Sequence, residues 1–329
     1  MTRVGLYLDL RIPPGTRGAD VYARTLDRVA EAERRGLEAA WVTEHHGFAD
    51  GYLPAPLTAA AAVAARTRTL RVGTGVVIAP MLPVETLAEQ AAVVDLVSGG
   101  RLELGVGAGW RAEEFTRVGA DHRARYTTLE DQLRRLPGLW ADGTVTPAPV
   151  QDPLPTWVGA RGPRGARLAG RVGAGLLWLD PALLAPYAEG LAAAGWPRAQ
   201  GRLGGLVNVL LADDPDAAKE EVRAAARRNR ASYRGNDDAA PAPVDGPAPL
   251  RSASARDATF PRLRVLTADD AVVEVREQLA GLADFPVTDV FCFADLGGLP
   301  AELVDRHLEL VTDVLRPGLA VPAPVGGAP

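Results

Sequence analysis

The fold is decided by three segments: WVTEHHGFADGYLPAPL (residues 41–57), TLRVGTGVVIAPMLP (69–83) and SGGRLELGVGAGWRAEEF (98–115). Each segment contains a short apolar run that is typical of a buried strand, and each run ends in polar residues or glycines. The carboxyl ends of neighbouring parallel strands lie at the same end of a sheet, and ligands of α/β proteins bind there. We therefore expect the three strand ends to share one ligand.

The rest of the chain repeats the alternation of strand and helix. We expect strands at 3–10, 39–43, 70–78, 101–106, 155–158, 175–179, 203–211 and 288–293. We expect helices at 19–35, 56–67, 83–97, 163–172, 181–194, 215–233, 268–282 and 300–315, with one or two more within 111–140. Eight nearly apolar strands between amphipathic helices predict a (β/α)8 TIM barrel. A doubly wound open sheet is the competing architecture, and it usually has fewer strands.

The barrel is expected to form a single domain over residues 1–320. Residues 235–262 are rich in Pro, Ala, Asp and Ser and have almost no large apolar residues, so we expect a mobile insertion. This insertion is either passively tolerated or a lid over the barrel mouth, because long loops often cover active sites. Residues 321–329 have low complexity and should form a disordered tail.

Composition excludes several classes of protein. The net charge of −5 and the scattered charges show no basic face for nucleic acid. The single cysteine, Cys292, lies in the apolar run VFCFA and is expected in the core, so disulfides and cysteine-based zinc sites are excluded. No signal sequence and no apolar run of membrane-spanning length is present, which predicts a soluble, cytoplasmic protein without membrane contact.

Glu44, His45 and His46 follow the second expected strand and include half of the chain's four histidines. Successive side chains on extended backbone point in different directions, so at most one histidine should face a central ligand. Such a histidine can act as a general base or donate a hydrogen bond. A metal site is the alternative, but no third ligand lies at a recognisable spacing.

Glycines mark the ends of the next two strands. Gly73 and Gly75 interrupt the third strand, which indicates either a bulge that approaches another group or simple packing. The sequence GVGAGW at 105–110 has the form of a dinucleotide-binding loop, but a Rossmann loop would fall in the first βαβ unit. We therefore exclude a conventional NAD site.

A candidate phosphate site follows the fifth strand, where GARGPRG (159–165) leads directly into a helix. Free backbone amides at a helix N-terminus, together with two arginines, suit an anionic group. The alternative is an ordinary loop with surface arginines. The residues of interest are Gly159, Ala160, Arg161, Gly162 and Arg164.

These motifs, in this order, resemble the bacterial luciferase-like flavin monooxygenases. The triplet EHH at 44–46, RVGTGVV at 71–77 and SGGRLELGVGAGWRAEEF match the second, third and fourth strands of that family. PTWVGARGPRGARLAGRVG at 155–173 resembles its fifth strand and phosphate loop, and LGGLPAELVDRHLELVTDVLRP at 296–317 its closing helix. The resemblance runs from residue 1 to residue 319, interrupted by 235–262.

The resemblance implies roles for individual residues. His45, with Glu44 and His46 beside it, matches the catalytic base next to the flavin. Gly75 and Val76 fall where the family has a non-prolyl cis peptide behind the isoalloxazine ring. Residues matching those near the flavin or its phosphate are Ala108, Gly109, Trp110, Gly159, Ala160, Arg161, Gly162, Arg164 and Trp178.

Two positions depart from the luciferase pattern. Ala108 stands where luciferase has an arginine that contacts the flavin phosphate, so Arg161 or Arg164 is expected to take that role. Gly107 replaces a cysteine near the ring, which argues against transferring luciferase's substrate or light emission to this chain.

By this resemblance, the chain is expected to be a homodimeric monooxygenase without a metal. It would take reduced FMN from a separate reductase and use O2 to oxygenate a small organic or natural-product substrate. One alternative is an oxidoreductase of the same superfamily that transfers hydride with the deazaflavin F420. A second alternative is a non-catalytic flavin-binding partner subunit, as in the luciferase heterodimer.

Overall fold

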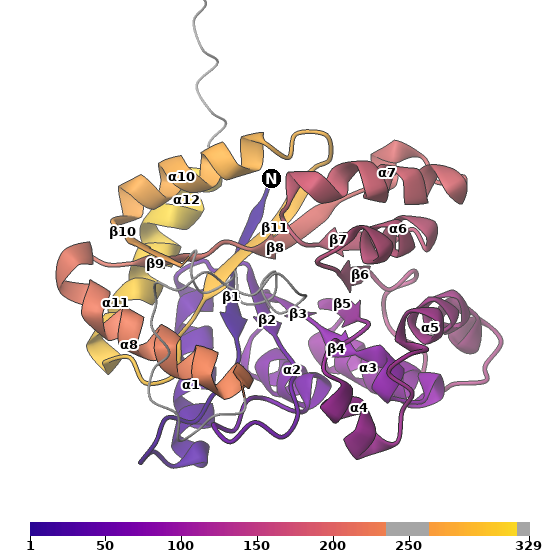
Figure 1. The fold of residues 1–329 in the computed structure, drawn as a ribbon, viewed down its shortest axis with the longest axis horizontal. Coiled ribbons are helices and arrows are strands. Elements are labelled where there is room, and N and C mark those ends of the chain that lie inside the picture. Colours follow the sequence, from indigo (N-terminus) through magenta and orange to yellow (C-terminus); the bar gives the residue numbers. More distant parts are fainter. Residues whose placement is uncertain (235–262, 321–329) are drawn as a thin grey trace, which may run out of the picture.

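Eight parallel strands close into a barrel in the computed structural model, which describes residues 1–234 and 263–320 (Figure 1). The strands follow the order β3-β2-β1-β11-β8-β7-β6-β5, and a pairing of β3 with β5 closes the ring. They are β1 (Arg3–Leu8), β2 (Ala39–Val42), β3 (Arg71–Thr74), β5 (Leu102–Gly107), β6 (Thr156–Gly159), β7 (Gly175–Leu177), β8 (Leu203–Leu206) and β11 (Val287–Phe293). The predicted TIM barrel is confirmed, and the open sheet is excluded.

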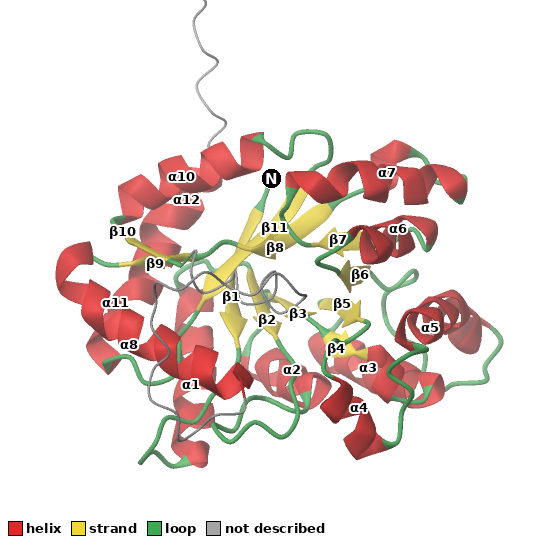
Figure 2. Cartoon of the chain, in the orientation of Figure 1, coloured by secondary structure: helices red, strands yellow, loops and turns green. Residues whose placement is uncertain are grey.

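Helices surround the strand ring (Figure 2). They are α1 (Gly18–Arg34), α2 (Pro56–Arg66), α3 (Val84–Ser98), α4 (Ala112–Val118), α5 (Arg125–Ala141), α6 (Pro163–Arg171), α7 (Leu184–Ala193), α8 (Pro215–Arg234), α10 (Ala268–Ala280), α11 (Ala301–Leu310) and α12 (Arg316–Ala320). Short 3-10 turns span Ala79–Met81, Pro181–Leu183 and Arg198–Gln200. Among the described residues, no helix combines the length and the apolar character needed to cross a membrane.

Three predicted elements differ from the structure. The strand predicted at 70–78 is divided by a cis peptide between Gly75 and Val76, after which β4 (Val77–Ile78) continues beside β5. The strand predicted at 203–211 is also two strands, because β9 (Val209–Leu211) leaves the ring to pair with β10 (Arg264–Leu266). The last helix does not stop at 315 but passes through a π-helical turn, Val311–Leu315, into α12. The expectations for 235–262 and 321–329 lie outside the described residues.

Aromatic side chains fill the barrel interior. Trp41 from β2 and Trp157 from β6 are fully buried, with ring centroids 5.8 Å apart and planes nearly perpendicular. Phe291 from β11 stacks on Trp41 at 5.2 Å. Leu177 and Ala39 complete this inner cluster, which is separate from the larger apolar layer under the helices.

Glycines on neighbouring strands make room for the two indoles. Gly73 lies beside Trp41 in the strand register, and a Cβ added at Gly73 would overlap the indole ring of Trp41. Gly175 stands in the same relation to Trp157. These glycines are therefore required by packing, which was the simpler of the two interpretations of Gly73.

Ion pairs close the amino-terminal end of the barrel. Arg3 contacts the buried carboxylates of Asp289 and Glu103 at 2.8 and 2.9 Å, and Arg71 also pairs with Glu103. The Trp157 indole N–H donates to Glu103 at 2.8 Å. Buried charges are tolerated only when they are paired and hydrogen-bonded, and this network satisfies that requirement.

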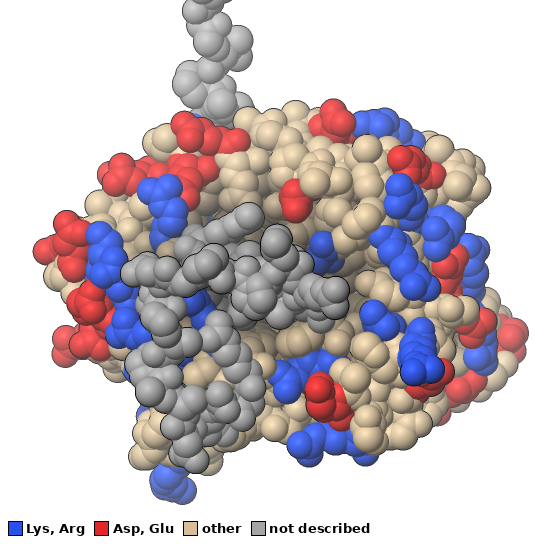
Figure 3. All heavy atoms as spheres, in the orientation of Figure 1, with Lys and Arg blue, Asp and Glu red and all other residues tan. Residues whose placement is uncertain are grey.

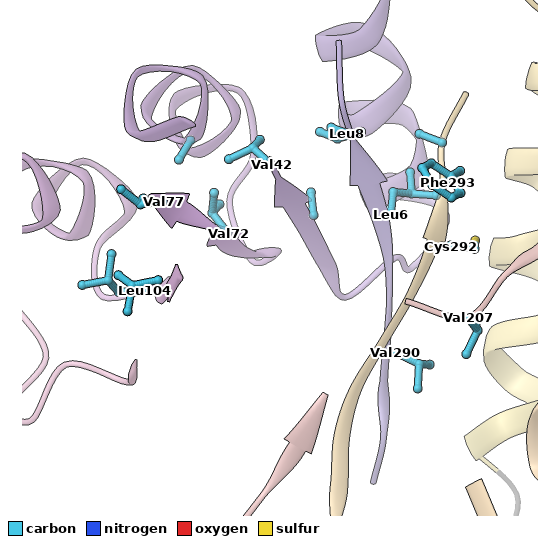
Figure 4. Close-up of a cluster of buried hydrophobic side chains, with 14 of the residues drawn as sticks. Leu6, Leu8, Val42, Val72, Val77, Leu104, Val207, Val290, Cys292 and Phe293 are labelled. Atoms are coloured by element: carbon cyan, nitrogen blue, oxygen red, sulfur yellow. The ribbon is translucent and has the colours of Figure 1, made fainter. Parts of the chain in front are cut away.

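The outward-facing residues of the strands pack against the helices (Figure 4). They include Leu6, Val42, Val72 and Leu104, all fully buried. Cys292 is also fully buried, as predicted, and burial raises the pKa of its thiol to about 12. This apolar layer attaches the helices to the ring.

We predict that Gly73→Ala destabilises the protein by about 1–3 kcal/mol, because a methyl group at this position overpacks the barrel interior against Trp41. The matched control is Gly138→Ala, since Gly138 lies within α5 and a Cβ there meets no atom within 4 Å. The control should stabilise the helix by about 0.5–1 kcal/mol. Chemical denaturation measures both free energies of unfolding, and equal effects would contradict the packing argument.

Candidate active site

The site residues predicted from the sequence lie at the carboxyl ends of the strands, which is where barrel enzymes place their chemistry. The ends of β2, β3, β5, β6 and β7 carry these residues, and the register pairs β2 with β3, β3 with β5, β5 with β6 and β6 with β7. On the face seen in Figure 3, Lys and Arg side chains gather beside the central hollow, over α5 and α6.

His45 forms a hydrogen bond with a glutamate that sequence reasoning missed. Its Nδ1 lies 2.8 Å from Oε1 of Glu114, and the same oxygen accepts the backbone N–H of His46 at 3.0 Å. Glu114 belongs to α4, and its side chain is 1% exposed. Because an ionised carboxylate can only accept, Nδ1 carries the proton and Nε2 of a neutral His45 is left as a proton acceptor.

Burial keeps the imidazole of His45 neutral. Desolvation is the largest effect and lowers the pKa of His45, and the charges of Arg11 and Arg111 act in the same direction. The hydrogen bond and negative charge of Glu114 oppose them without reversing the shift. The pKa of Glu114 is also lowered: burial acts upward, but the hydrogen bonds and charge of its partners outweigh it. A neutral histidine beside an ionised carboxylate is suited to accept a proton at neutral pH.

Glu44 and His46 stabilise the loop after β2. Their side chains contact other groups than those around His45. Oε1 of Glu44 lies 2.6 Å from Nε2 of His46, and Oε2 accepts the backbone N–H of Ile78 at 2.6 Å. The hydrogen bond to Glu44 raises the pKa of His46. The two histidines therefore point to different partners, as their adjacency predicted.

Aromatic rings enclose His45. Phe48 and Tyr52 from the same loop lie 4.9 Å from its ring, and Trp110 lies at 6.0 Å. Tyr233, from the end of α8, lies at 5.3 Å, and its carbonyl accepts a hydrogen bond from Arg111. Tyr233 is 188 residues from His45 in sequence, and no local pattern marked it.

The Gly75–Val76 peptide is cis, as the family resemblance implied. The Gly75 carbonyl accepts a hydrogen bond from the Tyr7 hydroxyl at 3.0 Å. The Val76 side chain packs where a Cβ at Gly107 or Gly159 would lie, 2.6 and 2.5 Å away. Val76 therefore explains why Gly107 has no side chain.

Only part of the segment after β5 lies next to His45. Ala108 is buried, and Gly109 has a positive φ of 69° that brings it against Phe115 and Ile78. Trp110 faces His45 and stacks on Tyr233 at 6.4 Å. Ala108 and Gly109 determine the course of the backbone after β5, and Trp110 is the residue of this segment whose side chain lies beside His45.

The loop after β6 has the form expected for an anion site. Gly159 ends β6, Ala160 and Gly162 follow, and α6 begins at Pro163 with neither a side-chain cap nor an acidic residue in its first turn. The Arg161 guanidinium lies 4.5 Å from the ring of Trp178, and that of Arg164 lies 4.4 Å from Tyr126. Two aromatic rings thus orient the arginines at an uncapped helix N-terminus.

A second charged cluster, also missed, lies at the end of β1. Asp9 and Arg11 are 5% and 3% exposed and form an ion pair of 2.9 Å, and Arg11 also pairs with Asp50. The Arg11 guanidinium lies 4.2 Å from the centre of the Tyr52 ring. The signal was present in the sequence, because DLR directly follows the first strand at the same end as the histidines. Within the described parts of the chain, no group of three or more potential ligands could hold a metal ion.

The amino-acid sequence is similar to a known protein family and to several characterised proteins. The family model of luciferase-like monooxygenases matches residues 2–288. The oxygenase component of the flavin-dependent trigonelline monooxygenase of Acinetobacter baylyi is 31% identical over 45% of this chain and 46% of its own. An F420-dependent glucose-6-phosphate dehydrogenase of Kineococcus radiotolerans is 30% identical over 59% of this chain and 65% of its own.

A solved structure shares the fold over almost the whole length. The monooxygenase RslO1 of Streptomyces bottropensis superposes with a TM-score of 0.78 at 22% identity, covering 96% of this chain and 99% of its own. The two curated relatives above are matched over less than two thirds of their length.

We predict that Glu114→Gln lowers the pKa of His45 further, because it removes the negative charge that opposes desolvation. An NMR titration of the four histidine rings measures the midpoint. Glu113→Gln is the matched control, since Glu113 is the exposed neighbour on α4 and should leave the midpoint unchanged. A midpoint that stays constant or rises in Glu114→Gln would contradict this assignment.

Proposed function

The chain belongs to the luciferase-like monooxygenase family, and from this premise we propose that it is a flavin-dependent monooxygenase that uses reduced FMN and O2. Its substrate is a small organic or natural-product molecule. The observation that carries the proposal is the hydrogen bond between His45 Nδ1 and Glu114, which makes Nε2 of a neutral imidazole the proton-accepting atom at the barrel mouth. Relatives named as oxygenases support the reaction class.

The residues at the mouth fit a flavin mononucleotide. The uncapped N-terminus of α6, with Arg161 and Arg164, would hold the phosphate through backbone N–H groups and guanidinium charge. Trp178 would border the ring, and the Gly75–Val76 segment would support it from behind. Ala108 offers no guanidinium where luciferase has its arginine, and Arg111 in the same loop donates to the Tyr233 carbonyl. The two α6 arginines are therefore the cations that we propose for the phosphate.

Each part of the chain has a distinct chemical task in this proposal. Reduced FMN, when bound, supplies the electrons that activate O2. His45 accepts or returns a proton at Nε2, while Glu114 fixes the ring orientation and tautomer. Glu44 and His46 position the loop from behind. The aromatic side chains around His45 exclude water from the reacting groups.

F420-dependent hydride transfer is the alternative, and it has its own support. Relatives named as F420-dependent dehydrogenases align with a larger share of this chain than the trigonelline oxygenase does. The EHH triplet favours FMN, because the F420 enzymes more often carry a different polar pair after the second strand. A non-catalytic flavin-binding subunit is the third candidate, and the intact His45–Glu114 pair argues against it.

We propose two partners for this chain, a reductase and a second copy of the chain itself. A separate reductase would supply reduced FMN, as the name of the trigonelline oxygenase component suggests for that protein. A second copy of the chain would pack against α3, where Val93, Leu96 and Val97 expose 43–48% of their surface at a spacing of one helix face.

We expect the purified protein to bind FMN, and Arg161→Ala and Arg164→Ala to weaken binding about tenfold each, because each removes a charge-assisted contact to phosphate. Arg167→Ala is the matched control, since Arg167 lies one turn further along α6 and pairs with Glu189 at 2.7 Å. Equilibrium dialysis of anaerobically reduced FMN measures affinity, with reduced F420 tested in parallel. Preference for F420 would overturn the FMN proposal.

His45→Ala and His46→Ala then test the chemistry. Anaerobically reduced FMN is bound to each variant and mixed with O2, and flavin reoxidation is followed by absorbance. We expect His45→Ala to change the rate and its pH dependence, and His46→Ala to retain the pH profile. If the His45→Ala profile equals the wild type, the proposed role of His45 is wrong.

We expect the protein to be a dimer in solution and Leu96→Glu with Val97→Glu to convert it to a monomer, because charges on an apolar contact face oppose association. Light scattering coupled to size-exclusion chromatography measures the mass. Val273→Glu is the control, since Val273 is 58% exposed on α10. A monomeric wild type, or a dimer that survives both charges, would exclude the α3 interface.

A further inference from the structure

Four aromatic rings surround His45, and one of them comes from a distant helix. Phe48 and Tyr52 belong to the loop after β2 that also carries His45, and Trp110 belongs to the loop after β5. Tyr233 lies near the end of α8, and its ring meets the imidazole edge-on at 5.3 Å. The His45 side chain is 11% exposed. The contacts that hold Tyr233 in place therefore decide how well this imidazole is shielded from solvent.

Arg111 connects Tyr233 to the other rings. Its Nη1 donates to the Tyr233 carbonyl at 2.7 Å. The same guanidinium lies 4.7 Å from the centre of the Phe48 ring and 5.4 Å from that of Trp110. Within the described parts of the chain, the buried Nε of Arg111 has no hydrogen-bond partner. The bond to the Tyr233 carbonyl therefore joins the backbone of α8 to a guanidinium that packs on two rings of the enclosure.

A second arginine, Arg11, contacts the same rings and is fixed by acids. Its guanidinium lies 4.2 Å from the centre of the Tyr52 ring and 5.1 Å from that of Tyr233. Asp9 and Asp50 both pair with it, and its side chain is 2% exposed. Arg11 and Tyr52 therefore form a fixed surface against which the Tyr233 ring packs.

The attachment of Tyr233 differs from that of the other three rings. Phe48, Tyr52 and Trp110 follow β2 or β5 directly, and those strands are paired on both sides within the barrel. Tyr233 lies near the end of a helix of 20 residues; its ring stacks on Trp110 at 6.4 Å, and its hydroxyl makes a long hydrogen bond of 3.4 Å to Tyr52. Loss of the bond from Arg111 should therefore release Tyr233 before the other rings.

We propose that Arg111 is a positioning residue that acts through Tyr233. Its bond to the Tyr233 carbonyl holds the end of α8 against His45, so that the Tyr233 ring keeps solvent and small organic molecules from the imidazole on this side. The use of a shielded imidazole rests on the proposed flavin chemistry, in which His45 exchanges a proton. The contact itself is a property of the protein without cofactor.

The experiment uses the full chain without cofactor and diethyl pyrocarbonate, a small electrophile that acylates neutral imidazole. Tandem mass spectrometry gives the rate of modification at His45, and the limiting rate at high pH is independent of the pKa. We expect Arg111→Met to raise this rate about tenfold, because the end of α8 opens more often once a hydrogen bond from a charged donor is lost. An unchanged rate at His45 would overturn the proposal.

Two controls separate a local effect from a general loosening of the fold. Arg227→Met is the matched variant, since Arg227 is an exposed arginine of the same helix and should leave the rate at His45 unchanged. His307 is 1% exposed and hydrogen-bonds to backbone groups through both ring nitrogens, so it should stay unmodified in each variant. If His307 reacts together with His45 in Arg111→Met, the local role of Arg111 is wrong.

A double-mutant comparison tests whether Arg111 acts through Tyr233. Tyr233→Ala removes the ring and should raise the rate at His45 at least as much as Arg111→Met does. Adding Arg111→Met to Tyr233→Ala should then have no further effect, because the ring that Arg111 holds is gone. Arg111→Lys retains a cationic donor and should stay close to the wild-type rate. Additive effects of the two changes, or equal rates in Arg111→Lys and Arg111→Met, would contradict this role.

Binding of FMN separates this inference from the proposed function. If FMN does not bind and Arg111→Met still raises the rate at His45, the flavin chemistry fails and the positioning role stands. If FMN binds and the rate at His45 is the same in Arg111→Met and the wild type, the flavin chemistry stands and the positioning role is wrong.

Discussion

The packing of two tryptophans inside the ring of strands is the constraint on which the rest of the structure depends. A ring of eight strands must be filled by side chains, and Trp41 and Trp157 are the largest members of the cluster that fills this one. Gly73 and Gly175 lie beside them because no larger residue fits. Below this layer the ion pairs of Glu103 close the floor. Only the carboxyl end of the barrel is left for a ligand.

At the carboxyl end of the barrel, Glu114 and Glu44 each accept one hydrogen bond from a histidine ring and one from a backbone N–H group. Glu114 binds the His45 ring and the His46 backbone, whereas Glu44 binds the His46 ring and the Ile78 backbone. The two histidines have opposite pKa shifts, because the His45 side chain is 11% exposed and that of His46 is 25% exposed. Burial dominates at the first position, and the carboxylate hydrogen bond dominates at the second. Two adjacent histidines thus differ in basicity, because the pKa of His45 is lowered and that of His46 is raised.

The barrel alone does not decide which cofactor is used, because relatives named for flavin and for F420 share this family. Charged side chains are unevenly distributed around the mouth of this barrel. Arg161 and Arg164 lie at the N-terminus of α6, whereas Arg111 in the loop after β5 donates to the Tyr233 carbonyl. Asp9, which pairs with Arg11, and Asp295 lie on the opposite side, where both line a cavity behind β1.

Sequence patterns predicted much of this fold, because strand and helix periodicity is local. The eight barrel strands, the helix after Gly162 and the buried Cys292 were all accessible from neighbouring residues. The pairing of β9 with β10 could not be predicted from neighbouring residues, because the long segment that includes 235–262 separates the two strands in sequence.

For the candidate site, local sequence predicted which residue types stand at the strand ends, including His45, Gly75–Val76 and Arg161. Their partners became known from the folded chain. Glu114 reaches His45 across 69 positions, and Tyr233 arrives from the end of α8. The tertiary structure also assigned Glu44 to the loop and brought Asp9 and Asp295 to one cavity. The physical reason is that hydrogen bonds and burial depend on distances in space, which closure of the ring sets and sequence spacing does not.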